Sequence, residues 1–368
     1  MNDTLRPWVV DGLAGADLGD ARLDERLPIL LDRFSRKPSV GIPAACRGGA
    51  GAEAAYRSFE NPQVPPRKIL APHYQAALRR IAARPVVLLA QDTTEIDPTR
   101  AEEVVGGPPD SESRQGSCDH AVVAFTPEGT PLGVVSAEIW ARDPEEFEES
   151  RGQEHEEDRA EPIGEEEGFR WPGGLRHACA VAGAAPRTKV VCLSDSEGGV
   201  YECHAEARAE QAEVEAHFIV RACQGRRLQE GEGEPSEEVA ASPVLRHPEV
   251  EAGKRPAKSG DDREREQARQ ERVAEVTVQA ATVGRGGPER PGGRPAPAKV
   301  NAVLVREPNP PGGEPPLERL LSTDLAIGSK GGAPEVIEYY CARRDIETCS
   351  RVPKGGWRGR AVATGSGR

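Results

Sequence analysis

The sequence predicts an α/β fold in which a small helical domain precedes a strand-rich core. Through residue 83 the apolar residues recur at helical spacing, whereas after Pro85 they fall into short runs typical of strands. Two of these runs lead into an aspartate, Asp92 in "LLAQDTTEID" and Asp195 in "KVVCLSDSEGG". With 368 residues, the chain is long enough for two domains and a sizeable core.

Three helices are expected in the N-terminal part. Residues 17–35 carry an apolar stripe of leucines and begin at Asp17 or Asp20, either of which can cap a helix. Further helices are predicted over residues 44–61 and 69–83. With their exposed arginines, these helices are expected to form a compact basic domain.

Strands are expected to dominate from residue 86 to residue 222. Residues 86–90 form the first, and residues 121–140 read as a hairpin around the turn at 127–130. A helix over 171–184 then leads to strands over 188–193 and 217–222. Helix and strand therefore alternate, as in α/β folds.

The remaining residues predict a β insertion followed by one more helix. Residues 224–270 are highly charged and rich in Gly and Pro, while 273–283 and 300–307 alternate like strands and 334–352 read as a helix. The predicted domains are a small helical domain (1–83), an α/β core in two parts (84–223 and 326–355), charged loops with the β insertion (224–325) and an irregular tail (356–368).

Charge is unevenly distributed along the chain. The net charge is −13, yet residues 1–91 hold 13 Lys or Arg against 9 Asp or Glu, a balance of +4 that leaves −17 elsewhere. Much of the acidic excess lies in residues 144–167 and 229–238, where such runs are typically solvated. The acidic total therefore does not exclude DNA binding by the basic N-terminal part.

Neither a membrane nor an oxidising compartment is indicated. No apolar run approaches the ~18 residues of a membrane span, and no signal-like leader opens the chain. The eight cysteines form no CxxC pair and no zinc-type spacing with histidine. A cytoplasmic protein with reduced cysteines is expected.

The two strand-end aspartates call for a joint explanation. The order of elements fits a ribonuclease-H-like core, in which the first and fourth strands are neighbours, so Asp92 and Asp195 would meet at one sheet edge. Nearby carboxylates repel unless a cation lies between them, and Mg²⁺ or Mn²⁺ suits oxygen ligands. Glu347 would supply a third ligand for phosphoryl transfer.

Four polar residues near the C-terminus share one predicted helix face. Tyr340, Arg343, Glu347 and Lys354 are spaced 0, +3, +7 and +14, which at about 100° per residue places them within a narrow arc. Such a face suits a metal ligand flanked by phosphate-binding groups. A solvated helix surface with Arg343 and Glu347 paired is the alternative. His120 is expected at a strand edge, and Thr93 and Thr94 in a local hydroxyl-to-backbone turn.

These motifs together resemble a known family over about residues 8–355. They are "LGDARLDERL" (18–27), "AAYRSFENPQV" (54–64), "QDTTEID" (91–97), "VVCLSDSEGGVYE" (190–202), "FIVRA" (218–222), "NAVLVREPNPPGGEPPLERLLST" (301–323) and "YCARRDIETCSRVPK" (340–354). The chain resembles the DDE transposases of the insertion-sequence-four group, with a Tyr-x2-Arg-x3-Glu-x6-Lys signature.

The resemblance implies a metal-dependent transposase that cleaves the ends of its own element and joins the freed 3′ hydroxyl to target DNA. It implies Asp92, Asp195 and Glu347 as ligands of Mg²⁺ or Mn²⁺. The residues that it implies for contacts with DNA or phosphate are Tyr340, Arg343, Lys354, Arg221 and Arg57. Double-stranded DNA is the implied partner, the family works as a homodimer, and the implied location is the bacterial cytoplasm, at the nucleoid during action.

Three alternatives stay open. Members of the family continue with a long helical region, whereas the residues after Lys354 show no helical period, which predicts a truncated, catalytically defective remnant that only binds DNA. A metal nuclease that nicks without joining strands is a second alternative. A glycosidase using paired carboxylates is disfavoured, because carbohydrate clefts are normally rich in aromatics and this chain has 15.

Overall fold

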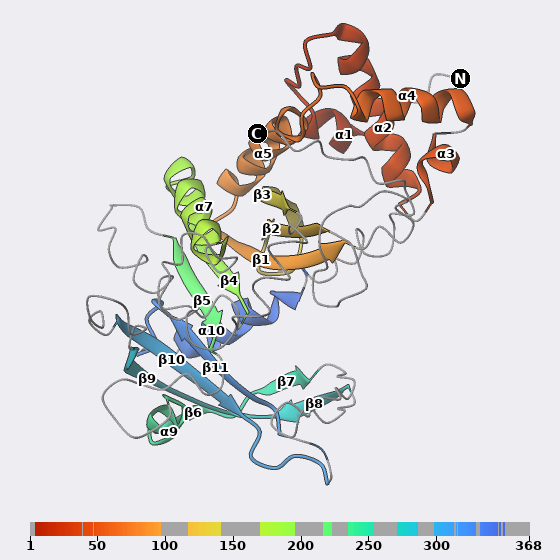
Figure 1. The fold of residues 1–368 in the computed structure, drawn as a ribbon. Coiled ribbons are helices and arrows are strands. Elements are labelled where there is room, and N and C mark those ends of the chain that lie inside the picture. The colour runs from red at the N-terminus through yellow and green to blue at the C-terminus, as the bar shows by residue number, and fades with distance from the viewer. Residues whose placement is uncertain are drawn as a thin grey trace, which may run out of the picture. The chain divides into compact units, whose positions relative to one another are not determined.

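The structure is a computed structural model in which the chain forms two compact units. It describes residues 4–38, 40–46, 48–96, 117–140, 170–195, 216–222, 235–252, 271–285, 298–312, 314, 316–328, 332–344, 346 and 349. The first unit comprises residues 1–158, 177–190 and 342–368, and the second comprises 159–176 and 191–341. Figure 1 shows the elements of each unit.

Helices make up the N-terminal part of the first unit, as the sequence predicts (Figure 1). They are α1 (Pro7–Gly12), α2 (Ala21–Arg36), α3 (Ile42–Ala45), α4 (Gly49–Phe59) and α5 (Pro66–Ala82). Asp20 is confirmed as the N-cap of α2, since its carboxylate accepts from the Arg22 N–H at 2.8 Å. The short helices α1 and α3 were not expected, because each holds less than two turns of pattern.

Two small apolar clusters hold these helices together, and α2 contributes to both. Leu27 packs with Val9, Leu13, Leu18 and Val64, while Leu30 packs with Ile42, Cys46, Ala52 and Ala55. Phe34 and Phe59 stack beside the second cluster, with ring centroids 6.1 Å apart. Burying this face of α2 leaves the opposite face to solvent.

The strands of the first unit are β1 (Val86–Ile96), β2 (Ser117–Phe125) and β3 (Pro131–Trp140), which pair antiparallel in the order β3-β2-β1. The predicted hairpin is confirmed as β2 and β3. Beyond β1 lies the start of β4 (Lys189–Ser194), where the Lys189 N–H donates to the Pro85 carbonyl at 2.8 Å. The helix before it, α7 (Arg170–Ala184), is also confirmed.

Helix α5 protects the free edge of β3. His73 Nε2 accepts from the Val134 N–H at 3.0 Å, and Arg80 Nε donates to the Leu132 carbonyl at 2.6 Å. Between these contacts, Gly133 has φ +137°, and a Cβ there would lie 2.9 Å from Ala77 Cβ, so only glycine allows the approach. Side chains of α5 thus take the place of a neighbouring strand.

The second unit contains a mixed sheet in the order β4-β5-β11-β10-β9-β6. Its strands are β5 (His217–Arg221), β6 (Val244–Arg246), β9 (Thr277–Arg285), β10 (Ala298–Arg306) and β11 (Glu318–Thr323), with β7 (Glu249–Ala252) and β8 (Arg272–Glu275) as a separate pair. Helix α9 (Pro235–Ala240) contacts β9 and β10, and α10 (Gly332–Cys341) follows β11. The predicted strands of residues 224–325 are therefore present, and β9, β10 and β11 lie in the same sheet as β4 and β5.

Three boundaries differ from the prediction. Strand β1 continues to Ile96, so Asp92 lies within the strand and not at its tip. Residues 273–283 divide into β8 and β9, and the charged region 224–270 holds α9, β6 and β7. The last predicted helix is interrupted: α10 ends at Cys341, residues 342–343 form a turn, and the described residues 344, 346 and 349 are helical again.

Candidate functional site

A row of cations covers the solvent side of α2. Its members are spaced so that, at about 100° per residue, they fall within an arc of about 100°. They are Arg22, Arg26, Arg33, Arg36 and Lys37, which directly follows the helix. All are exposed except Arg33, which is half-buried. We call these five residues the α2 basic face.

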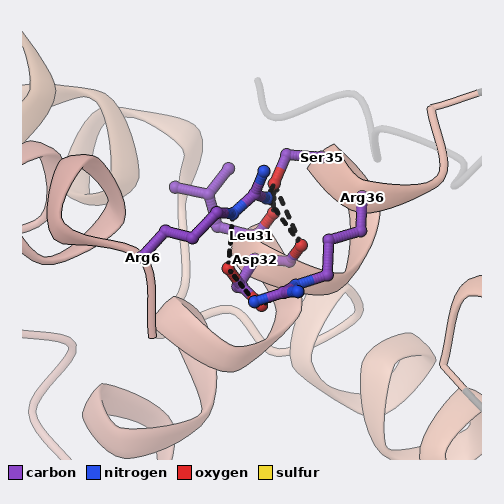
Figure 2. Close-up of polar contacts among 5 residues, drawn as sticks. All are labelled: Arg6, Leu31, Asp32, Ser35 and Arg36. Carbon is purple, nitrogen blue, oxygen red and sulfur yellow. Dashed lines mark hydrogen bonds and ion pairs between the residues drawn. The ribbon is translucent and has the colours of Figure 1, made fainter. Parts of the chain in front are cut away.

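A buried carboxylate fixes the C-terminal end of this face. Figure 2 shows Arg6 and Arg36 converging on Asp32, which is only 3% exposed. Arg36 Nε donates to Asp32 Oδ2 at 2.6 Å and Arg6 Nε to Asp32 Oδ1 at 2.8 Å. Arg36 and then Arg6 lower the pKa of Asp32 to about 2, so the carboxylate is charged at neutral pH.

Arg6 makes further contacts that tie the N-terminal segment to α2. Its Nη2 donates to the Asp32 carbonyl at 3.0 Å and to the hydroxyl of Ser35, which itself donates to the Leu31 carbonyl at 2.7 Å (Figure 2). Its guanidinium lies over the Trp8 ring, 5.1 Å from the centroid. The two arginines are therefore held beside each other by one aspartate.

The positive charge is local to this face. Residues 5–64 hold eight Lys or Arg and eight Asp or Glu, so that segment has no net charge. Burial raises the pKa of the Cys46 thiol, while the nearby Arg33 and Arg26 oppose that rise. Arg57, a predicted DNA contact, is exposed on α4 and forms an ion pair with Glu53 one turn away. The arrangement of charge, and not its sum, distinguishes α2.

A second group of functional candidates lies around Asp92 in β1. Arg343 Nη2 donates to Asp92 Oδ1 at 2.9 Å, joining residues 251 positions apart. The Arg343 side chain is 9% exposed and that of Asp92 17%. Two residues that the sequence analysis assigned to the site are thus in contact. They form an ion pair with each other, whereas the sequence analysis expected Asp92 to bind a divalent cation and Arg343 to bind a phosphate.

The opposite face of β1 carries a buried polar cluster that the sequence analysis missed. Thr93 Oγ1 lies 2.9 Å from His120 Nδ1, and Gln91 Oε1 lies 3.2 Å from His120 Nε2. His120 is 3% exposed, and in the sheet register it lies directly opposite Thr93. The expected strand-edge histidine and local threonine turn are therefore wrong, because the two residues bond to each other across the strands.

On the Asp92 face, two buried oxygens lack a hydrogen-bond partner among the described residues. They are Thr94 Oγ1 and Asp119 Oδ1, and their residues lie directly opposite each other on β1 and β2. Desolvation raises the pKa of Asp119. Since side chains alternate along a strand, Asp92, Thr94 and Asp119 share one face. The sequence signal that could have identified Asp119 is the strand-like alternation of "SCDHAVVAF", which places Asp119 and His120 on opposite faces.

The described residues of this face meet the needs of a hard cation only in part. A carboxylate that is paired with a guanidinium and a second, buried carboxylate oxygen without a partner are oxygen donors of the kind that Mg²⁺ or Mn²⁺ prefers. In the part of the chain that the structure describes, no three His, Cys, Asp or Glu side chains gather into a metal site. Asp92 with Asp119 is thus a partial donor set.

The second unit places two other predicted residues side by side. Strands β4 and β5 run parallel, with Ser194 paired to Val220. The residues that follow this pair are Asp195 and Arg221, both half-buried. The register therefore places an acidic and a cationic residue at the carboxyl ends of the two strands. Tyr340 is 7% exposed in α10 of the same unit.

Tyr340 and Arg343 do not share one continuous helix as predicted, because α10 ends at Cys341 and Arg343 lies in the turn that follows. After the turn, the Ile346 N–H donates to the Arg343 carbonyl at 3.1 Å, and Ile346 is fully buried. Glu347 and Lys354 lie outside the described residues, so the convergence of Asp92, Asp195 and Glu347 stays a prediction. No helix among the described residues is both long and apolar enough to span a membrane.

Two comparisons with known proteins bear on these sites. Residues 5–64 match the family described as transposase DNA-binding, which covers α1–α4 and the whole α2 basic face. Among solved structures, the chain is similar to the piggyBac transposase in a synaptic complex with hairpin DNA, with a TM-score of 0.38 and 9% identity. That match covers 84% of this chain and 48% of the piggyBac chain. The family match supports a DNA-binding domain of the transposase type in residues 5–64.

Proposed function

We propose that the chain is a transposase that binds duplex DNA through the α2 basic face and cleaves it with the carboxylates that include Asp92. The match of residues 5–64 to transposase DNA-binding domains carries the proposal. The exposed row of cations on α2 supports it, because phosphates are contacted by arginine and lysine side chains held in register.

DNA binding follows from the geometry of α2. Its apolar side is anchored in two clusters, and Asp32 orients Arg36 and Arg6, so the cations lose little conformational freedom on binding. A helix fits the major groove of B-form DNA, and neighbouring arginines reach its phosphates or base edges. The strong salt dependence of such contacts is the property to measure.

The test replaces one exposed arginine at a time, so that each protein loses one positive charge. Arg26→Gln should weaken duplex binding and reduce the slope of log K against log salt by about 1. Arg57→Gln is the matched control, because Arg57 is already paired with Glu53. Equal losses in the two proteins, or a slope that does not change, would rule out the α2 basic face as the binding surface.

The proposed chemistry is divalent-cation-dependent cleavage of the phosphodiester at an element end, followed by strand transfer. Asp92, Asp195 and Glu347 are the proposed ligands, on the strength of the sequence resemblance. Asp119 is a proposed additional oxygen donor on the Asp92 face. When bound, Mg²⁺ or Mn²⁺ would neutralise the charge that develops on the phosphate and activate the attacking oxygen.

The protein's own residues would position the DNA. Arg343, Tyr340 and Lys354 are proposed to hold phosphates near the cleaved bond, and Arg221 lies beside Asp195 for the same purpose. The cluster of Gln91, Thr93 and His120 would fix the backbone on both sides of Asp92, so that its carboxylate keeps one direction. Accurate positioning of this kind is a large part of phosphoryl-transfer catalysis.

DNA binding without cleavage is a second candidate. The observation that favours it is the ion pair of Asp92 with Arg343, which occupies a proposed cation ligand. The experiment incubates the full chain with Mg²⁺ or Mn²⁺ and duplexes carrying candidate ends from the DNA around its own coding sequence. We expect nicks with 3′ hydroxyls that Asp92→Asn abolishes and the control Asp324→Asn retains. Binding with no nicking in any protein would favour the second candidate.

A further inference from the structure

The ion pair between Asp92 and Arg343 joins the proposed cation ligand to a proposed phosphate-binding residue. Arg343 Nη2 lies 2.9 Å from Asp92 Oδ1, and both side chains are mostly shielded from water. Shielding matters because an ion pair at the surface contributes little, whereas one of low exposure strongly affects the charged groups involved. The carboxylate of Asp92 therefore already has a counter-ion in the free protein.

A divalent cation and Arg343 compete for the Asp92 carboxylate. The hydrogen bond occupies a lone pair of Oδ1, and the guanidinium repels a second positive charge close by. Binding of a cation at Asp92 is thus opposed by the ion pair. Conversely, removal of Arg343 from Asp92 makes that carboxylate a stronger ligand.

We propose that Arg343 is an internal counter-ion that holds Asp92 in the absence of DNA and transfers to a DNA phosphodiester when the divalent cation binds. The inference rests on the proposed function and adds a coupling to it. Phosphate and cation would each bind more tightly in the presence of the other, because the phosphate draws Arg343 away from the carboxylate that the cation needs.

The local structure allows this exchange. Arg343 lies in the turn after α10, and rotation of its side chain leaves the backbone hydrogen bonds of this segment intact. A guanidinium offers five N–H donors in a planar fork that fits the oxygens of a phosphate as well as those of a carboxylate. When Arg343 leaves, the charge of the Asp92 carboxylate loses that counter-ion, and Asp119 adds a carboxyl oxygen on the same face, which favours a cation in the place of Arg343.

The first experiment measures Mn²⁺ binding to the purified full chain without DNA, by the electron paramagnetic resonance signal of free Mn²⁺. Wild type is compared with Arg343→Gln, Arg343→Lys, Asp92→Asn and the control Asp324→Asn, whose carboxylate pairs with His217 in the second unit. Arg343→Gln should bind Mn²⁺ at least about threefold more tightly than wild type. Arg343→Lys should stay near wild type, and Asp92→Asn should lose the site.

The second experiment adds dimethyl phosphate, a phosphodiester monoanion with no base or sugar. It should tighten Mn²⁺ binding to wild type and leave Arg343→Gln unchanged, because that variant has no guanidinium to transfer. Circular dichroism and urea unfolding of each variant identify any that fail to fold. If Arg343→Gln fails, Arg343→Met, which likewise has no guanidinium, replaces it in the comparison.

The outcomes separate this inference from the function on which it rests. If Mn²⁺ binds at Asp92 but Arg343→Gln binds it no more tightly, the counter-ion role is wrong and the cation site stands. The counter-ion role is equally wrong if dimethyl phosphate leaves Mn²⁺ binding to wild type unaltered. If no protein binds Mn²⁺, or Asp92→Asn binds it as wild type does, the proposed cation chemistry at Asp92 fails together with this inference.

Discussion

The α2 basic face and the β1–β2 strand pair use polar residues in opposite ways. On α2 the cations are exposed, spaced along one side of a helix, and expected to act together through the phosphates of a duplex. In β1 and β2 several polar groups are shielded from water and bonded to particular partners, as His120 is to Thr93 and Gln91. Substitutions in the first region should change salt dependence, and those in the second should change stability and geometry.

The two regions differ because the cations of α2 are exposed to water and the polar groups of the strand pair are largely shielded from it. An exposed charge is solvated with or without a partner, so removing it costs the fold little. A buried polar group loses its hydrogen bonds with water on folding and must replace them with hydrogen bonds to other protein groups. Both regions belong to the first unit, which makes urea unfolding of the full chain a common scale on which to compare them.

The largest effect on stability is expected for Asp92→Asn. This change removes the charge that faces the shielded Arg343 guanidinium and should lower the free energy of unfolding by about 3 kcal/mol. Adding Arg343→Met, which replaces the cation by an apolar side chain, should restore most of that loss. Urea unfolding measures both. An unchanged midpoint in Asp92→Asn would show that the ion pair behaves like a surface pair.

A smaller loss is expected for Thr93→Val, which keeps the shape of the side chain but deprives His120 Nδ1 of its hydroxyl partner. The cost should be about 1–2 kcal/mol, and Thr93→Ser, which retains the hydroxyl, should cost less. If valine is tolerated as well as serine, the hydrogen bond does not stabilise the strand pair.

His73 provides a pH-dependent contrast. Its Nε2 accepts from the Val134 N–H and must therefore be neutral, and burial, followed by the charge of Arg80, lowers the pKa of His73 below 6.5. Its contribution is fully present above pH 6.5 and lost as pH falls through the lowered pKa. His73→Gln, which can accept without titrating, should lose less stability than wild type between pH 7.5 and 5. Parallel pH profiles would contradict this.

The smallest effect should come from Arg57→Gln on α4. Its ion pair with Glu53 joins exposed side chains one helical turn apart, which is worth about 0.3–0.5 kcal/mol. The midpoint of urea unfolding should hardly move, and added salt should abolish the difference. A loss above about 1 kcal/mol would mean that the exposed charges of the helical domain also act through particular partners.

Local patterns in the sequence determined much of this protein. The apolar stripe and capping aspartate of α2, the turn between β2 and β3, and the apolar run of β4 each lie within about twenty residues, and the structure confirms all three. The positions of Asp92 and Arg343 were also recognisable as chemically unusual. In each case the signal is a residue type at a fixed spacing, which a single stretch of chain contains.

Tertiary contacts decided the rest. The continuation of β1 through Gln91 and Thr93 depends on His120 from the next strand, since polar residues remain in a buried strand only when they are satisfied. The end of α10 at Cys341 and the pairing of Arg343 with Asp92 depend on residues 251 positions apart. Spacing along a chain reveals which groups are chemically suited to a site, but only the folded chain selects the partner that each group meets.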